Sequence, residues 1–343
     1  MKRLSSILIL VLSTAVLVVS SGGGALTGLW AFVDGNGPNG INKDTTQRAI
    51  APQLTVFGSK LYATWQEDAN TPAFHATQIR VAVYNGNASS PSWTFVDGNG
   101  TSGINKNTTR NAVAPQLTVF GSKLYATWQE DTNNPAVSAT QIRVAVYNGN
   151  HSSSSWTFVD GNGMSGINKN TTRNAVAPQL TVFGSKLYAT WQEDTNNLAV
   201  YATQIRVAVY NGNASSPSWA FVDGNGPNGI NNDTTQSAVA PQLAVFGSKL
   251  YATWLEGNNN LAVYATQIRV AVYNGNDSSP SWAFVDGNGP NGINKDTTQS
   301  AVAPQLTVFG SKLYAIWQES TNTPYTNASQ IRVAVTKSDA VSQ

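Results

Sequence analysis

The stretch APQLTVFGSKLYATWQEDTNNPAVSATQIRVAVYNGN at residues 114–150 returns at residues 177–213 with only positions 135 and 138 changed. Outward from this pair the same pattern continues through the chain, because tryptophan recurs every 63 residues in two series. Self-similarity at a fixed period indicates a repeat architecture. The chain is therefore built from five copies of one unit. The first series is Trp30, Trp93, Trp156, Trp219 and Trp282, and the second is Trp65, Trp128, Trp191, Trp254 and Trp317.

Within one unit, short runs of alternating apolar and polar residues are separated by turn residues. Residues 114–120 form the first run, and Gly121-Ser122-Lys123 turns the chain into residues 124–130. A polar loop then leads to residues 141–147, and Asn148-Gly149-Asn150 leads to residues 156–160. Alternation and turn residues at this spacing predict antiparallel strands and hairpins. Four strands per repeat are typical of one blade of a β-propeller.

The two ends of the chain predict how such a ring closes. The chain begins with a fourth-strand sequence at residues 29–33 and ends after a third-strand sequence at residues 330–335. The last blade thus lacks its own fourth strand, and the N-terminal strand is expected to complete it. The sequence predicts an all-β, five-bladed propeller of four-stranded antiparallel blades, closed in this way so that no sheet edge is exposed. An open solenoid or a string of separate domains is the alternative.

The N-terminus predicts export. Lys2 and Arg3 precede an apolar run at residues 7–19, which is followed by small residues. This is typical of a signal peptide, and the run is short for a membrane span. We expect residues 1–24 to be the signal peptide and residues 25–343 to be one propeller domain, secreted or held at the cell surface, with no membrane span in the mature chain. An uncleaved anchor is the alternative.

Composition limits the partners and the sources of stability. Charged residues make up 11% of the chain, and its net charge of +2 disappears when Lys2 and Arg3 are removed. Such a balance gives no reason to expect nucleic acid as a partner. The absence of cysteine excludes disulfides and thiolate metal sites. Stability after export must come from packing and topology.

The order Pro-x-Leu-x-x-Phe, Lys-Leu-Tyr-x-x-Trp, Gln-Ile-Arg-Val-x-Val-Tyr-Asn-Gly and Ser-Trp resembles the repeats of bacterial and fungal propeller lectins. The resemblance covers the mature chain at the level of blade pattern. It implies monosaccharide pockets between blades, built from an arginine, an acidic residue and an aromatic ring. The candidates of these types are the second tryptophan series together with Arg80, Arg143, Arg206, Arg269 and Arg332, and Glu67, Glu130, Glu193, Glu256 and Glu319.

These three residue types suit a sugar, and they also suit the interior of a blade. An indole ring can cover the apolar face of a sugar, while arginine donates and glutamate accepts hydrogen bonds from its hydroxyls. A tryptophan in every blade can equally be core packing between sheets, and a repeated Arg/Glu pair can be a structural ion pair. Repetition alone leaves both interpretations open.

A glycine-rich Asp-Gly-Asn-Gly segment also recurs in every copy. Oxygen ligands at alternating positions of such a loop are used by calcium sites. Each loop offers one carboxylate, so we expect no cofactor, with a structural turn as the first interpretation and weak Ca²⁺ binding as the second. The candidate ligands are Asp34, Asn36, Asp97, Asn99, Asp160, Asn162, Asp223, Asn225, Asp286 and Asn288.

The function predicted from these features is a secreted, multivalent, carbohydrate-binding protein of lectin type, with glycans or another extracellular ligand as partner. Five weak sites on one ring would act together on a surface that displays many ligands. A surface scaffold or adhesion propeller that binds protein is the alternative. A glycoside hydrolase is a further one, but it needs two carboxylates in unlike environments, and the repeats offer five equivalent sets. No catalytic residue, and no enzyme, is predicted.

Overall fold

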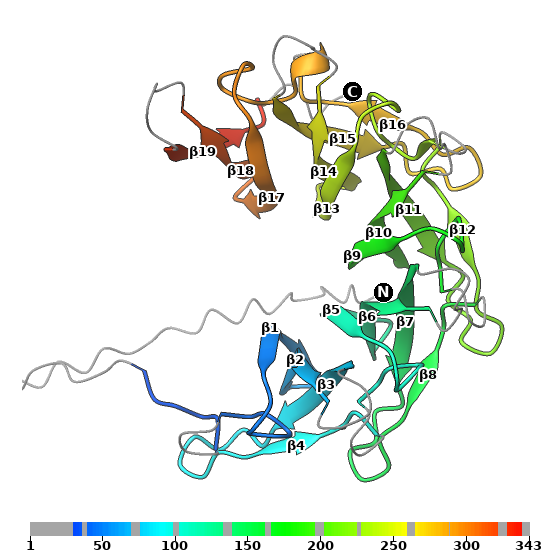
Figure 1. Ribbon diagram of the computed structural model, residues 1–343, viewed down its shortest axis with the longest axis vertical. Helices are drawn as coiled ribbons and strands as arrows, with labels where there is room; N and C mark the ends of the chain where they lie inside the picture. Colours follow the sequence, from blue (N-terminus) through cyan, green and yellow to red (C-terminus); the bar gives the residue numbers. More distant parts are fainter. Residues whose placement is uncertain are drawn as a thin grey trace, which may run out of the picture.

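The computed structural model describes residues 30–35, 40–69, 76–98, 103–132, 139–161, 166–195, 202–224, 228–258, 265–287, 289–321 and 328–337. These residues form five antiparallel sheets arranged as blades along an arc (Figure 1). The predicted all-β fold with five blades is thereby confirmed. Among the described residues, no helix is long and apolar enough to cross a bilayer.

Each blade is a meander whose strands pair in chain order. Blade one is β1 (Ala49–Phe57), β2 (Lys60–Asp68), β3 (Thr77–Tyr84) and β4 (Trp93–Phe95). Blade two is β5 (Ala112–Phe120), β6 (Lys123–Asp131), β7 (Thr140–Tyr147) and β8 (Trp156–Phe158). Blade three is β9 (Ala175–Phe183), β10 (Lys186–Asp194), β11 (Thr203–Tyr210) and β12 (Trp219–Phe221). Blade four is β13 (Ala238–Phe246), β14 (Lys249–Gly257), β15 (Thr266–Tyr273) and β16 (Trp282–Phe284), and it is followed by the short 3-10 helix η3 (Gly289–Asn291). Blade five is β17 (Ala301–Phe309), β18 (Lys312–Ser320) and β19 (Ser329–Val335).

The first hairpin of each blade turns on a glycine and a serine. In blade two, Gly121 and Ser122 have φ values of 53° and 59°, between Phe120 and Lys123, which are paired residues of β5 and β6. Two successive residues with positive φ match the right-handed twist of a two-residue hairpin. The sequence therefore turns where the pattern predicts.

The core lies between neighbouring blades. Between blades two and three, Tyr125, Ile142 and Val144 of blade two pack in one buried cluster with Leu187 and Trp191 of blade three. Full burial of one such side chain contributes roughly 1.5–3 kcal/mol. The equivalent residues form the same cluster between blades one and two and between blades three and four, so Trp128, Trp191 and Trp254 belong to this core. Trp317 packs in a smaller cluster with Ile268 of blade four, and Trp65 packs within blade one.

Three tryptophans of the first series, Trp156, Trp219 and Trp282, link adjacent blades through hydrogen bonds at the outer strands. Nε1 of Trp156 donates to the carbonyl of Val96, which follows β4, at 2.8 Å. Nε1 of Trp93 donates in the same way to the carbonyl of Val33, also at 2.8 Å. Val33 therefore occupies, beside blade one, the place that Val96 occupies beside blade two.

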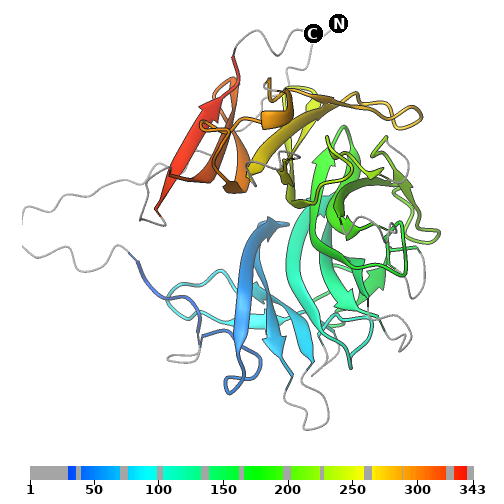
Figure 2. The ribbon, with the colours of Figure 1, turned by 45° about the horizontal axis from the view of Figure 1, so that its top comes forward.

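The expected closure by the N-terminal strand is not seen. Residues 30–34 are not part of a strand, the sheet of blade five has three strands, and Trp30 and Phe32 are 93% and 91% exposed. Pairing of this segment with β19 would require blade five to lie against blade one. Figure 2 shows blade five beside blade four and apart from blade one. The fourth strands of blades one to four contain only three residues each. A strand of this length forms few hydrogen bonds with β19, so its pairing would contribute little toward holding blade five against blade one.

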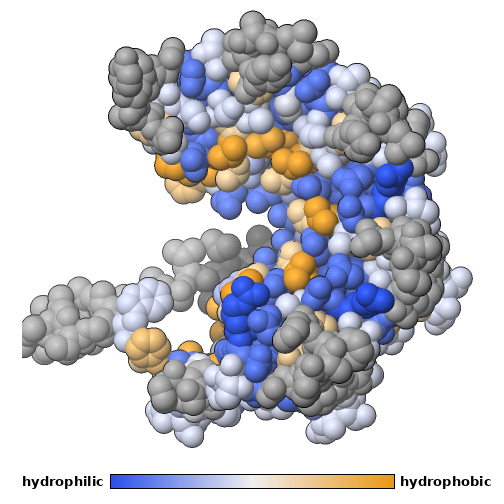
Figure 3. Space-filling view, viewed as in Figure 1, coloured by the Kyte–Doolittle hydropathy of each residue, from blue (hydrophilic) through white to orange (hydrophobic). Residues whose placement is uncertain are grey.

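The open arc leaves apolar surface on both terminal blades. Ile331 of blade five is 68% exposed, whereas the equivalent Ile205 of blade three is fully buried. Leu54 of blade one is 66% exposed, whereas the equivalent Leu180 is 7% exposed. Figure 3 shows apolar surface bordering the opening.

Candidate functional site

The Arg, Glu and Trp residues of each repeat come together as one unit at the end of the blade. In blade two, Oε2 of Glu130 accepts hydrogen bonds from the backbone N–H of Lys106 at 2.9 Å and from Nε1 of Trp128 at 3.0 Å. Its Oε1 accepts from the backbone N–H of Asn107 at 3.0 Å. The glutamate thus fastens the incoming connection from blade one to β6.

Arginine joins this glutamate to the aspartate that follows the fourth strand. Arg143 donates from Nη1 to Oδ2 of Asp160 at 3.1 Å, and its Nε lies 3.7 Å from Oε1 of Glu130. Burial raises the pKa of Glu130, while the hydrogen bond from Trp128 and the charge of Arg143 act to lower it. The positive charge of Arg143 therefore stabilises two buried carboxyl groups, those of Glu130 and Asp160.

The burial of these side chains distinguishes a sugar-binding role from a structural one. All five glutamates and all five tryptophans of the second series are buried, as are four of the five arginines. The exception is Arg332 in blade five, whose side chain is 33% exposed and lies 3.1 Å from Glu319. This placement favours the structural ion pair and core packing that the sequence left open. A role in ligand binding stays a prediction that this geometry does not support.

The Asp-Gly-Asn-Gly segments are only partly described. Asp97, Asp160 and Asp223 pair with the arginine of their own blade, and the asparagines at positions 36, 99, 162, 225 and 288 lie outside the described residues. Within the described ranges, no group of three His, Cys, Asp or Glu residues is placed to hold a metal ion. Weak calcium binding stays a prediction. The carboxylates of Asp97, Asp160 and Asp223 already form ion pairs with arginine.

A pair of tyrosines fills the rim of each interface between successive blades up to blade four. Tyr125 of β6 and Tyr210 of β11 meet edge to face with ring centroids 6.2 Å apart, and Tyr188 and Tyr273 repeat this at 6.2 Å. In blade five the second tyrosine is replaced by Thr336. Tyr251 of blade four therefore has no ring opposite it at this interface.

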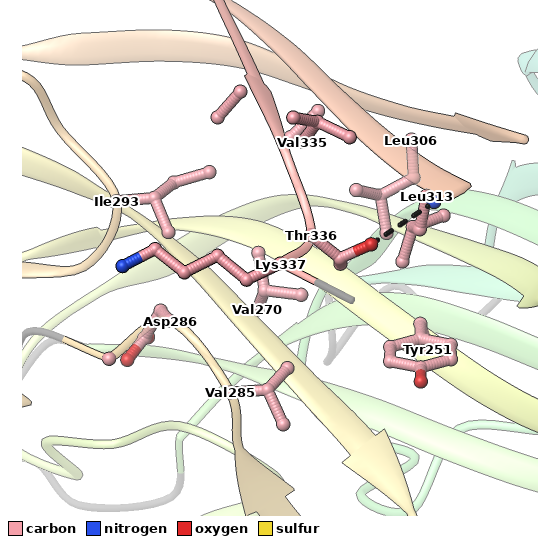
Figure 4. Close-up of a pocket in the computed structure, with 13 residues that line it drawn as sticks. Tyr251, Val270, Val285, Asp286, Ile293, Leu306, Leu313, Val335, Thr336 and Lys337 are labelled. Carbon is pink, nitrogen blue, oxygen red and sulfur yellow. Dashed lines mark hydrogen bonds between the residues drawn. The ribbon is translucent and has the colours of Figure 1, made fainter. Parts of the chain in front are cut away.

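A cavity of about 420 Å³ lies at this altered interface between blades four and five. Its walls include the apolar side chains of Val270, Val285 and Ile293 from blade four and its following connection, with Leu306 and Leu313 from blade five. Figure 4 shows Tyr251, Thr336, Lys337 and Asp286 as the polar residues among those labelled. A concave apolar space with a few polar groups is the usual form of a small-molecule site.

Asp286 is the one carboxyl group among the 13 residues that line this cavity. Its Oδ2 lies 3.0 Å from Nε of Arg269, while Nη1 of the same arginine donates to the carbonyl of Gly289 in η3 at 2.6 Å. Burial raises the pKa of Asp286, and the charge of Arg269 only partly offsets this. A carboxyl group held toward its protonated form can donate a proton to a bound molecule.

The repeat pattern does not predict this cavity, because five similar copies suggest five similar interfaces. The signal was present as Ala334-Val335-Thr336-Lys337, where the other blades read Ala-Val-Tyr-Asn. Loss of a tyrosine ring from a packed interface leaves space unless neighbouring side chains move into it. The candidate site therefore lies where blade five departs from the repeat, at Thr336.

A second space of about 380 Å³ lies where the first strands of the five blades converge. It is lined by the Ala-Pro-Gln segment of every blade, beginning at Ala51, Ala114, Ala177, Ala240 and Ala303. Its lining contains no carboxyl group, and acid–base chemistry therefore has no side chain to use there.

No family model matches the chain, and no curated protein matches it. Solved structures do match. A structure described as the polysaccharide lyase Uly1 has a TM-score of 0.51 and 13% sequence identity, over 85% of this chain and 60% of that one. The endo-arabinase of Bacteroides thetaiotaomicron has a TM-score of 0.43 and 12% identity, over 83% and 93% of the two chains. The α-L-arabinanase of Cellvibrio cellulosa, solved with arabinohexaose, has a TM-score of 0.41 and 11% identity, over 84% and 91%.

At these identities the similarities show the propeller fold. One of them also contradicts the functional prediction, because the similar structure with a TM-score of 0.51 is described as a polysaccharide lyase and not as a lectin. The prediction of a lectin that is not an enzyme is therefore wrong, and membership of a lectin family is not shown. The resemblance to lectins rested on blade residues that the structure buries, and such residues are required by the fold whatever the ligand.

Proposed function

We propose that the protein is a glycan-cleaving enzyme, with the cavity between blades four and five as its site. The observation that carries this proposal is a buried carboxyl group with a raised pKa, Asp286, in the wall of a 420 Å³ cavity. A perturbed carboxyl group in an apolar pocket is a reasonable candidate for acid–base catalysis. The names of the similar structures, which include glycoside hydrolases and a polysaccharide lyase, agree with a glycan substrate.

In the proposed reaction, Asp286 gives its proton to the oxygen that leaves when the bond between two sugars breaks. In hydrolysis, a water molecule forms the new bond to the sugar carbon and loses a proton. In elimination, the neighbouring carbon loses its proton and a C=C bond forms. In both, the leaving oxygen takes the proton of Asp286, and the proton released passes to solvent, since Asp286 is the one carboxyl group in the lining. The apolar walls at Val270, Val285 and Leu306 suit the C–H face of a sugar ring. Lys337, exposed at the end of β19, adds a positive charge for an acidic substrate.

The secretion predicted from residues 1–24 fits this proposal, since polysaccharides of cell walls and matrices lie outside the cell. The N-terminal segment lies outside the described residues, so secretion remains part of the proposal.

The proposal is tested with the purified full-length chain on a panel of polysaccharides that contains arabinans, rhamnogalacturonans and glucuronans. New reducing ends report cleavage, and ultraviolet absorbance of an unsaturated product separates elimination from hydrolysis. We expect Asp286→Asn to lower the rate by roughly 10²-fold or more, the usual contribution of a positioned proton donor.

Asp223→Asn is the matched control, because Asp223 has the same place in blade three and pairs with Arg206 at 3.1 Å beside a filled interface. Both changes remove a carboxylate from a buried ion pair, so their effect on folding is comparable. Equal activity of the two variants, or no cleavage of any glycan by the folded wild-type chain, would overturn the proposal.

A further inference from the structure

The interface between blades three and four contains a carboxylate held by three donors. Asp277, in the turn after β15, accepts hydrogen bonds at Oδ1 from the hydroxyls of Tyr188 at 3.1 Å and Tyr273 at 2.7 Å. Its Oδ2 accepts from Nζ of Lys186 at 2.5 Å. These hydrogen bonds outweigh the effect of burial and lower the pKa of Asp277. The three donors therefore form a cradle that fits a carboxylate.

The interface between blades two and three repeats this cradle without the carboxylate. Lys123, Tyr125 and Tyr210 stand one repeat earlier than the three donors, and Ala214 stands where Asp277 is found. The tyrosine rings keep their arrangement, at 6.2 Å and 66° here against 6.2 Å and 65° around Asp277. Ala214 packs against the cluster that contains both rings. The two tyrosine rings keep their positions although the sequence has no acceptor at residue 214.

With alanine at position 214 in place of an aspartate, the hydroxyl of Tyr210 has lost its acceptor. Tyr210 is 3% exposed, and its buried hydroxyl has no hydrogen-bond partner among the residues that the structure describes, whereas the hydroxyl of Tyr273 donates to Asp277. Leaving a buried polar group unsatisfied costs about 1–3 kcal/mol. Burial, with a smaller contribution from Tyr125, raises the pKa of Tyr210 to about 12, so the hydroxyl keeps its proton and remains a donor at neutral pH.

We propose that Lys123, Tyr125 and Tyr210 form a binding site for the carboxylate of a small ligand, which enters where Asp277 places its own carboxylate one blade later. The position can be reached from solvent, since Ala214 is only half-buried and the Asp277 side chain is 19% exposed. A carboxylate provides an acceptor for the Tyr210 hydroxyl and a counter-ion for Lys123. The site is separate from the cavity at Asp286 and does not depend on the function proposed there.

The interface between blades one and two shows that the same position accepts a polar group of another kind. His151 takes the place of Asp277 there, with Nε2 lying 2.8 Å from the hydroxyl of Tyr62 and Nδ1 lying 3.4 Å from Nζ of Lys60. Burial, together with the charge of Lys60, lowers the pKa of His151, which favours the neutral ring. Two of these three cradles thus hold a polar side chain, although His151 leaves the Tyr147 hydroxyl without a hydrogen-bond partner among the described residues. The third has only a methyl group.

The test uses acetate as the probe and the melting temperature of the full-length chain as the readout, at fixed pH and ionic strength with chloride as the reference. A ligand that binds only the folded state raises the melting temperature, and the rise increases with the logarithm of ligand concentration once that exceeds the Kd. We expect acetate to raise the melting temperature of the wild-type chain. We expect Ala214→Asp to melt higher than wild type in chloride and to gain nothing further from acetate, because its own carboxylate fills the cradle.

Asp277→Ala is the matched reverse change, since it empties a second cradle. It should melt below wild type in chloride and gain more from acetate than wild type does. Tyr210→Phe should lose most of the wild-type response while keeping its fold, because it removes one donor and no ring. Equal responses of wild type and Ala214→Asp to acetate, or no stabilisation by Ala214→Asp in chloride, would refute the site.

Two further probes identify the kind of carboxylate. Glucuronate with glucose as its neutral counterpart tests for an acidic sugar, and a response to glucuronate but not glucose supports that source. A response to acetate alone supports a small organic acid. Binding at this site and cleavage at Asp286 can fail independently, because Ala214→Asp leaves the cavity intact and Asp286→Asn leaves the cradle intact.

Discussion

At the scale of single residues, this protein places charge in its interior at the same point of each blade. Glu130 is satisfied by two backbone N–H groups and one indole, and Arg143 joins it to Asp160. A buried ion pair of this kind is weak grounds for stability in itself, but removing one partner is costly because the other charges stay buried.

Arg143→Ala is therefore expected to lower the free energy of unfolding by about 3–5 kcal/mol, since it leaves Glu130 and Asp160 without their shared cation. Urea unfolding followed by tryptophan fluorescence measures this. Arg332→Ala is the control, and its cost should be clearly smaller because the Arg332 side chain is one-third exposed. Unchanged stability of Arg143→Ala would mean that the unit is not structural and would reopen its role as a ligand site.

At the scale of elements, the first strand of every blade contains a bulge at its Ala-Pro step. Ala114 has a φ of 55°, and the register of β5 and β6 shifts between Val113 and Gln116. Oε1 of Gln66 in blade one accepts the hydrogen bond of the Ala114 N–H at 3.1 Å. In blade four this glutamine is replaced by Leu255, yet Ala303 of blade five keeps a φ of 53°. The bulge is therefore set by its own strand and not by the glutamine.

Ala114→Gly should raise the free energy of unfolding by about 0.5–1 kcal/mol, because glycine adopts positive φ without the steric cost that alanine meets. Ala189→Gly, at a buried position inside β10, is the control and should lower it by a similar amount. Chemical unfolding of both variants checks the two signs. Destabilisation by Ala114→Gly would show that the bulge is not strained.

At the scale of the whole molecule, an open arc exposes on its terminal blades the side chains that inner blades bury. Ile331 and Val333 of β19 are 68% and 63% exposed, although their counterparts Ile205 and Val207 are fully buried. Large exposed apolar patches are unusual on soluble monomers. The apolar faces of blades one and five are built from the same residues that meet at every internal interface.

Ile331→Ser and Ile205→Ser test the open arrangement, since they make the same change at equivalent repeat positions. Ile205→Ser should lower the free energy of unfolding by about 3 kcal/mol or more, through a cavity and a buried hydroxyl. Ile331→Ser should change it by less than about 0.5 kcal/mol, as is usual for an exposed position. Equal and large losses would show instead that blade five packs against blade one in solution.

The amino-acid sequence is enough to predict the blades. The 63-residue period, the alternation of apolar and polar residues and the turn residues specify which strands pair within a blade. These strands are neighbours in the chain, so the sequence is sufficient to predict their pairing. It also contained the signals of Thr336 and Ala214, as departures from an otherwise strict repeat. The structural effect of these departures could not be predicted from the sequence. Each tyrosine packs against a ring of the neighbouring blade, and the sequence does not show which ring that is.

The fold was needed to show which of the repeated residues are buried. Arginine, glutamate and tryptophan have the same order in a sugar pocket as in a buried ion pair, and burial distinguishes the two. The structure also decided that Trp30 and Phe32 stand free of β19, since closure depends on contact between the two ends of the arc. Sequence repeats specify how each blade packs on the next, whereas the meeting of the first and last blades is a long-range contact that no repeat encodes.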